Sequence, residues 1–160
     1  MAISLENTLI GVAGEYLVAG ELSLRGYLAS ITLRNSRGID IIASNADASK
    51  SVSIQVKTNS NGSAIWLLNK KAEQFYSNDH YYVFVALEKI GKRPRYHIVP
   101  SKVVAEYTSS SHRNWLAGSK RDGSPRKDSS MRKFIDNENI YLERWDLISL
   151  ENANRVTGGL

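Results

Sequence analysis

Residues 37–58 read Arg-Gly-Ile-Asp-Ile-Ile-Ala-Ser-Asn-Ala-Asp-Ala-Ser-Lys-Ser-Val-Ser-Ile-Gln-Val-Lys-Thr, two alternating runs separated by a polar turn. Successive side chains of a strand point to opposite faces of a sheet, so this pattern predicts a β-hairpin with one apolar face. We expect residues 45–50 to connect the strands, which sets Ser44 opposite Ser51. The apolar face then carries Ile39, Ile41, Ala43, Val52, Ile54 and Val56.

The other face of this hairpin carries an acid, an amide and a lysine. The same register places Asp40 opposite Gln55, with Lys57 two residues further along the strand. Opposed residues have Cβ atoms about 5 Å apart, so one cation can touch the Asp40 carboxylate and the Gln55 carbonyl oxygen. Magnesium needs only one or two carboxylates and keeps several waters. A metal-bound water can attack a phosphodiester while a nearby lysine orients that water or takes its proton. The alternative is that these three side chains are ordinary solvated residues.

At these residues the chain resembles the PD-(D/E)XK nuclease superfamily, the restriction-endonuclease-like nucleases. The signature of that superfamily is an Asp on one strand and Glu-x-Lys or Gln-x-Lys on the next, which Asp40 and Gln55-Val56-Lys57 match. Gly14-Glu15-Tyr16 supplies the helical Glu of the Holliday-junction-resolvase-like and Mrr-like branches. The resemblance extends over residues 8–100. Ile39 stands where the superfamily name has Pro, and Gln55 replaces the commoner Glu, which removes one negative charge from the metal site.

The resemblance implies a three-layer α/β/α fold, a restriction-endonuclease-like core with a mixed central sheet. It also implies a DNA endonuclease dependent on Mg²⁺ or Mn²⁺, in which Lys57 activates water. The implied metal ligands are Asp40, the Gln55 oxygen, Glu15 and the Val56 carbonyl. One such site cuts one strand, so we expect a homodimer or higher homo-oligomer if the substrate is duplex or branched DNA. The alternative is a non-catalytic DNA-binding or assembly subunit with the same fold, which the neutral Gln55 favours.

Composition restricts the class of protein. A chain of 160 residues suits one domain, which we place at residues 1–150, with 151–160 as a flexible tail. The absence of cysteine excludes disulfides and thiolate metal sites. No leader-like segment and no membrane-spanning run of apolar residues is visible, so we expect a cytoplasmic protein without a membrane partner.

The positive charge is concentrated in one segment. The net charge is +5, yet residues 89–133 hold 12 Lys or Arg against three acidic residues, a net +9 that leaves −4 for the remainder. Lysine and arginine contacts to phosphate supply most non-specific DNA affinity, so this segment predicts contact with DNA. A solvated basic loop in a protein that binds no nucleic acid is the alternative. The candidate DNA-binding residues are Arg34 and Arg37 near the hairpin, and Lys120, Arg121, Arg126 and Lys127 in the basic segment.

Upstream of the hairpin, helical spacing predicts a helix that Asn7 or Thr8 caps and that runs to Leu24, with Gly26 ending it. The expected core stripe is Leu9, Val12, Ala13, Tyr16 and Leu17.

Glycines inside this helix predict close packing. Gly11 and Gly14 cost helix stability, so we expect another backbone to approach there, the sheet edge that carries Asp40, with Glu15 aimed at the metal. Glu21 and Arg25, spaced i,i+4, are expected to form a surface pair.

The remaining chain reads as alternating elements. Strands are expected at residues 28–33, 64–68, 80–88, 95–99 and 140–148, and helices at 69–77, 101–107 and 131–138. The run 80–88 lacks alternation, which is typical of a strand buried on both faces and therefore predicts helices on both sides of the sheet. Residues 108–130 are expected to form a long loop in which Trp115 belongs to a small satellite core, and Trp145 is expected to pack on the body.

Other chemistries lack support in the sequence. His80, His97 and His112 stand at unrelated spacings with no matching acid, which argues against a zinc site or a Ser-His-Asp hydrolase. No phosphate-binding Gly-rich motif is present.

Overall fold

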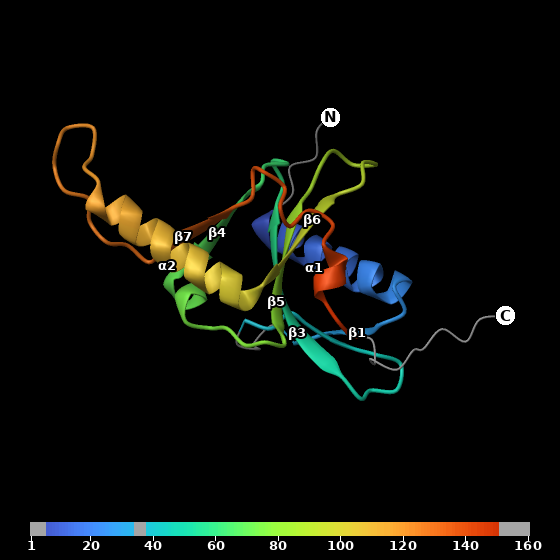
Figure 1. The fold of residues 1–160 in the computed structure, drawn as a ribbon. Helices are drawn as coiled ribbons and strands as arrows, with labels where there is room; N and C mark the ends of the chain where they lie inside the picture. The colour runs from blue at the N-terminus through green and yellow to red at the C-terminus, as the bar shows by residue number, and fades with distance from the viewer. Residues whose placement is uncertain (1–5, 34–37, 151–160) are drawn as a thin grey trace.

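The computed structural model describes residues 6–33 and 38–150. Its centre is a five-stranded sheet with the order β1-β2-β3-β5-β6 (Figure 1). The strands span Leu28–Ile31 (β1), Ile41–Ser44 (β2), Ser51–Asn59 (β3), His80–Ala86 (β5) and Arg95–Pro100 (β6). Strands β3 and β5 are parallel and the other neighbours are antiparallel, so the sheet is mixed, as expected.

The predicted hairpin is present as β2 and β3. Its register pairs Ser44 with Ser51, and residues 45–50 form the connection, as predicted. The ladder changes at its open end, where the Asp40 N–H donates to the Ile54 oxygen at 2.9 Å. The expected pairing of Asp40 with Gln55 is therefore wrong.

Two layers cover the two faces of the sheet. Helix α1 (Asn7–Leu24) packs on one face, over the apolar side of the β2–β3 hairpin. The other face carries helix α2 (Ser101–Ala117), the 3₁₀ turn η1 (Lys70–Glu73) and a small antiparallel sheet. That sheet pairs β4 (Ile65–Asn69) with β7 (Met131–Ile135). The three-layer α/β/α arrangement is confirmed, and β5 is buried on both faces because a core lies on each side of it.

Helix α1 has the predicted bounds but presents a different face. Its buried positions include Ile10, Val18 and Leu22, whereas Leu9 is 53% and Tyr16 is 68% exposed. Of the predicted stripe, Leu17 packs against the core as expected, whereas Leu9 and Tyr16 do not, because apolar residues occur on both faces of this helix. The predicted cap is also wrong, since Glu6 occupies the N-cap position without a side-chain hydrogen bond.

The close approach predicted at the helical glycines occurs at one of them. A Cβ atom added to Gly14 would lie 1.8 Å from Thr58 Oγ1 on β3, whereas nothing lies within 4 Å of one added to Gly11. The contact is therefore with a side chain of β3, whereas we expected the backbone at the sheet edge that carries Asp40. Gly14 thus lets α1 lie directly on β3.

The Glu21–Arg25 pair is not the surface pair that we expected. Glu21 is buried and binds both Arg25 and Arg93, with N···O distances of 2.7 and 2.8 Å. Burial raises the pKa of Glu21, but hydrogen bonds and charges of the two arginines outweigh it and leave that pKa lowered. Trp145 packs on the core as predicted, with the Arg25 guanidinium 4.3 Å from its ring centroid.

The C-terminal third departs most from the expectations. Helix α2 extends to Ala117 instead of ending at Tyr107, and the Thr108 Oγ1 in the added part donates to the Val104 oxygen at 2.7 Å. Residues 131–135 form strand β7 rather than a helix. Within β7 the inward residues include Arg132, which is buried against Glu73, so a charge interrupts the apolar alternation.

The predicted strand 140–148 is also absent. Residues 140–148 form an irregular chain with a short 3₁₀ turn, η2 (Trp145–Leu147). None of the helices in residues 6–33 and 38–150 is long and apolar enough to cross a membrane.

Candidate active site

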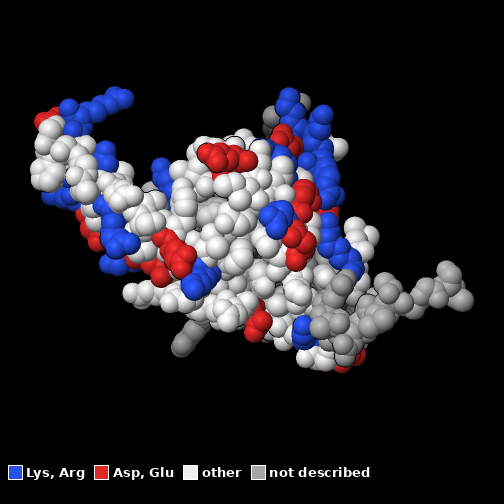
Figure 2. All heavy atoms as spheres, in the orientation of Figure 1, with Lys and Arg blue, Asp and Glu red and all other residues white. Residues whose placement is uncertain are grey.

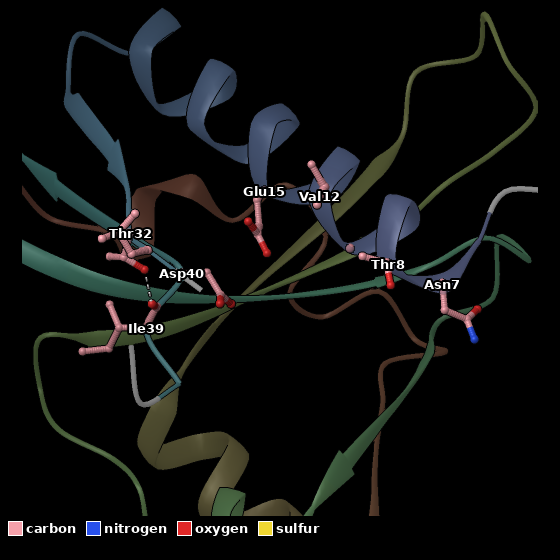
Figure 3. A pocket seen from close by; sticks show the side chains of 9 residues that line it. Asn7, Thr8, Val12, Glu15, Thr32, Ile39 and Asp40 are labelled. Atoms are coloured by element: carbon pink, nitrogen blue, oxygen red, sulfur yellow. Dashed lines mark hydrogen bonds between the residues drawn. The ribbon is translucent and has the colours of Figure 1, made fainter. Parts of the chain in front are cut away.

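Two carboxylates share a cavity between helix α1 and the start of strand β2. Glu15 from α1 and Asp40 from the residue before β2 line it, together with Thr8, Val12 and Thr32. The cavity has a volume of about 260 Å³. In Figure 3 the Glu15 side chain points from the helix toward the strands that carry Asp40. The structure thus brings together an acid of the helix and an acid of the hairpin, as the resemblance implied.

Backbone hydrogen bonds fix Asp40 from three directions. Its Oδ2 accepts from the Val56 N–H at 2.7 Å, its N–H donates to Ile54 and its carbonyl accepts from the Thr32 N–H at 2.9 Å. Beside it, the Thr32 hydroxyl donates to the Ile39 carbonyl at 2.6 Å, the dashed line in Figure 3. One carboxylate oxygen of Asp40 is therefore held by β3.

Burial dominates the electrostatics of Asp40. Desolvation raises the pKa of its carboxyl group, while the Val56 hydrogen bond and the Lys57 charge act in the opposite direction and leave a net increase. Burial raises the pKa of Tyr82, and the negative charge of Asp40 raises it further, to about 12. The positive charge of Lys57 therefore reaches Asp40, although no direct ion pair joins these two side chains among the described ion pairs.

Gln55 and Lys57 line a neighbouring, larger cavity. It has a volume of about 590 Å³ and lies between β3 and the β4–η1 connection. Gly38 forms part of its wall with φ +71°, a left-handed conformation that suits glycine, and the Gln55 Oε1 lies 3.5 Å from where a Cβ atom of Gly38 would stand. The predicted site residues thus occupy two adjacent cavities, with Glu15 and Asp40 in one and Gln55 and Lys57 in the other.

The donor set fits a hard divalent cation. Magnesium takes one or two carboxylates and fills its octahedron with water, which Glu15 and Asp40 can provide for in a cavity of this size. In residues 6–33 and 38–150 no group of three or more His, Cys, Asp or Glu side chains could hold a metal ion. A cation here would therefore keep several waters. The Val56 peptide contributes its N–H to Asp40, and a role for its carbonyl in metal binding stays a prediction.

The predicted DNA-binding residues separate into two sets. Arg34 and Arg37 lie outside the described residues. Lys120, Arg121 and Lys127 are exposed on the connection after α2. Figure 1 shows this connection extending beyond the end of the helix and returning along it to β7. Arg126 instead folds back onto the helix, where it donates to the Trp115 carbonyl at 2.7 Å. In Figure 2 basic side chains gather over α2 and this connection.

Not all of the basic segment is free for a ligand. Arg93 pairs with Glu21 and Glu143, Arg95 with Glu88, and Arg132 with Glu73. Three of its arginines therefore hold elements of the fold together.

Aromatic and histidine expectations also need correction. Trp115 is 44% exposed and belongs to neither core cluster of the described residues; it stacks on His112 with centroids 5.5 Å apart. Two histidines do have acidic partners, because His97 Nδ1 lies 2.6 Å from Asp136 Oδ2 and His112 Nε2 lies 2.7 Å from Asp128 Oδ1. The His97 pair is buried, and the two acids lie far from their histidines in sequence.

Sequence reasoning missed the residues that border the carboxylates from other elements. Thr8 and Thr32 line the small cavity, and Tyr82 lies beside Gln55 through the parallel pairing of β3 and β5. Parallel neighbours are joined by long connections, so the sequence holds no local signal for this contact.

Comparisons with known proteins agree with this architecture. Neither the scan against protein-family models nor the search of the curated proteins finds a match. Among solved structures the chain is similar to a bacterial homing endonuclease, with a TM-score of 0.52, 12% identity, and coverage of 90% of this chain and 93% of the other. It is also similar to Hjc, a Holliday junction resolvase of Archaeoglobus fulgidus, with a TM-score of 0.45, 16% identity and coverage of 82% and 86%. The chain therefore has the restriction-endonuclease-like fold.

Proposed function

We propose that this protein is a metal-dependent DNA endonuclease. The observation that carries the proposal is the cavity shared by the Glu15 and Asp40 carboxylates, with the positive charge of Lys57 reaching Asp40. The restriction-endonuclease-like fold supports it, because the homing endonuclease with this fold is a DNA-cleaving enzyme by its name.

Each residue has a chemical role in this proposal. A bound Mg²⁺ would polarise the phosphate and lower the pKa of a coordinated water. Glu15 and Asp40 would hold the ion, and the Val56 N–H keeps one Asp40 oxygen in place. Lys57 would orient the attacking water and offset the negative charge that develops on the phosphate. Gln55 lines the neighbouring cavity, and its role as a further oxygen ligand stays a prediction.

Substrate binding is assigned to the basic surface. Lys120, Arg121 and Lys127 on the connection after α2 would contact phosphates on one side of the cut. Double-strand cleavage by a chain with one site requires two copies, so we propose a homodimer on duplex or branched DNA.

Plasmid cleavage tests the proposal directly. Supercoiled plasmid is incubated with the protein and Mg²⁺ or Mn²⁺, and nicked and linear products are measured for the unmodified chain, Asp40→Asn and Lys57→Ala. We expect both substitutions to lower the cleavage rate by at least about 100-fold, because each removes a group that acts on the transition state. Asp79→Asn and Lys50→Ala, exposed residues of the same types outside the basic segment, serve as matched controls and should cleave normally. Unchanged cleavage by Lys57→Ala would refute the assigned site.

A non-catalytic DNA-binding subunit is the second candidate, and the neutral Gln55 favours it. It predicts salt-sensitive DNA binding without cleavage. Gln55→Glu distinguishes the endonuclease from the non-catalytic subunit, because it introduces the Glu that is commoner in the superfamily signature. A protein that does not cleave DNA should gain metal-dependent cleavage from this substitution. An active site should respond with a changed preference between Mg²⁺ and Mn²⁺.

A further inference from the structure

The larger cavity beside Lys57 has features that a metal site does not require. We call it the η1 pocket; Lys57, Leu68, Lys71, Ala72, Gln74 and Phe75 line it. At about 590 Å³ it has more than twice the volume of the cavity between Glu15 and Asp40. Lys57 belongs to its wall, so the pocket opens directly beside the proposed catalytic lysine.

The chemistry of the η1 pocket suits an anion with a flat apolar part. Leu68, Ala72 and Tyr82 provide buried apolar surface, and Lys57 and Lys71 provide two positive charges. No Asp or Glu is among the described residues that line it. A lone phosphate would gain nothing from the apolar wall, whereas a nucleotide combines both properties.

Phe75 and Gln74 are placed to recognise a base. Phe75 is 42% exposed, and its ring meets His80 in an edge-to-face contact with centroids 4.8 Å apart. The Phe75 N–H donates to the Lys71 carbonyl at 3.0 Å, which holds the aromatic residue close to η1. The neighbouring Gln74 is exposed and carries an amide that can both donate and accept hydrogen bonds.

The turn that carries these residues is ordered by its own cap. The Asn69 Oδ1 accepts from the Lys71 N–H at 2.9 Å, so η1 begins at a fixed point directly after β4. Ala72 is buried against the core beneath. The wall of the pocket is therefore anchored in the fold rather than formed by a loose loop.

From this arrangement we propose that the η1 pocket receives an unpaired or extruded nucleobase next to the phosphate that Lys57 contacts. This inference rests on the proposed function, and it makes the preferred substrate DNA that carries a base outside the helical stack. The base stacks on Phe75 and is read by the Gln74 amide, while Lys71 binds an adjacent phosphate. Extrusion costs least where the base is already unpaired, which produces selectivity for such DNA.

The test compares affinities for three duplexes of equal length in low salt and EDTA, so that no cleavage occurs. One duplex is fully paired, one has a single extra unpaired base, and one has an abasic residue at the same extra position. Stacking of one base on an aromatic side chain should make the second duplex bind about tenfold more tightly than the third. Phe75→Ala and Gln74→Leu should each reduce this ratio toward one.

Tyr76→Ala is the matched control, because Tyr76 is the adjacent exposed aromatic residue and lines a different surface, beside α2. It should leave the ratio unchanged. Thermal unfolding of each variant shows whether the fold is intact; Phe75 contacts the buried His80, so if Phe75→Ala unfolds, the exposed Gln74→Leu variant decides.

Three results would overturn the pocket assignment. The first is equal affinity of the unmodified chain for the duplex with the unpaired base and for the abasic duplex. The second is an unchanged ratio of these affinities in both Phe75→Ala and Gln74→Leu. The third is loss of this ratio in Trp115→Ala while the two pocket variants keep it. If plasmid cleavage by the unmodified chain persists in any of these cases, only the pocket assignment fails. Absence of binding to all three duplexes would refute the proposed function together with the pocket.

Discussion

The buried carboxyl group of Asp40 makes the stability of the fold depend on pH. Burial raises the pKa of its carboxyl group above the ordinary value, so the folded protein holds this proton more tightly than the unfolded chain does. The resulting stability is fully present below the unfolded pKa and is lost as the pH rises through the folded pKa. At neutral pH the buried charge therefore destabilises the fold.

Asp40→Asn should consequently raise the melting temperature at pH 7.5 in EDTA while it abolishes cleavage. Asn keeps an oxygen that can accept from the Val56 N–H, and it carries no charge to desolvate. The difference in melting temperature between the two proteins should shrink as the pH falls through the raised pKa of Asp40, because the carboxyl group then becomes neutral as well. A destabilised Asp40→Asn protein at pH 7.5 would contradict the sign of this effect.

At the scale of elements, the contact between α1 and β3 depends on the missing side chain of Gly14. A Cβ atom there would stand 1.8 Å from Thr58 Oγ1, so Gly14→Ala forces the helix away from the strand. Overpacking of this kind costs about 1–3 kcal/mol. We expect Gly14→Ala to lower the free energy of unfolding by that amount and to weaken cleavage, because Glu15 moves with the helix.

Gly20→Ala is the matched control in the same helix. Nothing lies within 4 Å of a Cβ atom at Gly20, so this substitution should stabilise the helix by about 0.5–1 kcal/mol. Adding Thr58→Ala to Gly14→Ala removes the hydroxyl that clashes and should recover most of the lost stability. Chemical denaturation of the four proteins measures these differences; equal stability of Gly14→Ala and Gly20→Ala would contradict the contact.

At the scale of the whole molecule, the connection that follows α2 carries exposed cations. Replacing Lys120, Arg121 and Lys127 by Ala should weaken DNA binding equally for all sequences and reduce the slope of log K against log salt by about 2–3, if each residue contacts one phosphate. Arg144→Ala, an exposed arginine paired with Asp146, is the control and should leave the slope unchanged. Binding titrations at several salt concentrations check this. An unchanged slope in the triple variant would place the DNA path elsewhere.

The sequence by itself predicted much of the hairpin. The alternation in residues 41–44 and 51–58 is local, and a slip of one residue would expose the apolar face, so the register could be predicted correctly. The spacing of Asp40, Gln55 and Lys57 followed from it, although the irregular end of the ladder moved Asp40 from Gln55 to the Val56 N–H.

Only the tertiary structure decided the features that depend on distant partners. Arg132 lies inside a strand because Glu73 neutralises it, and α2 continues past Tyr107, whose ring packs against Phe134 of β7. The same holds at the site, where Glu15 and Asp40 line one cavity because Gly14 lets α1 lie on β3. The spacing of apolar residues along the sequence determines which face of a helix or strand is apolar, because this face depends only on residues that are close in the chain. Which elements then meet depends on packing between residues far apart in the chain, and that packing divided the four predicted residues between a small acidic cavity and the η1 pocket.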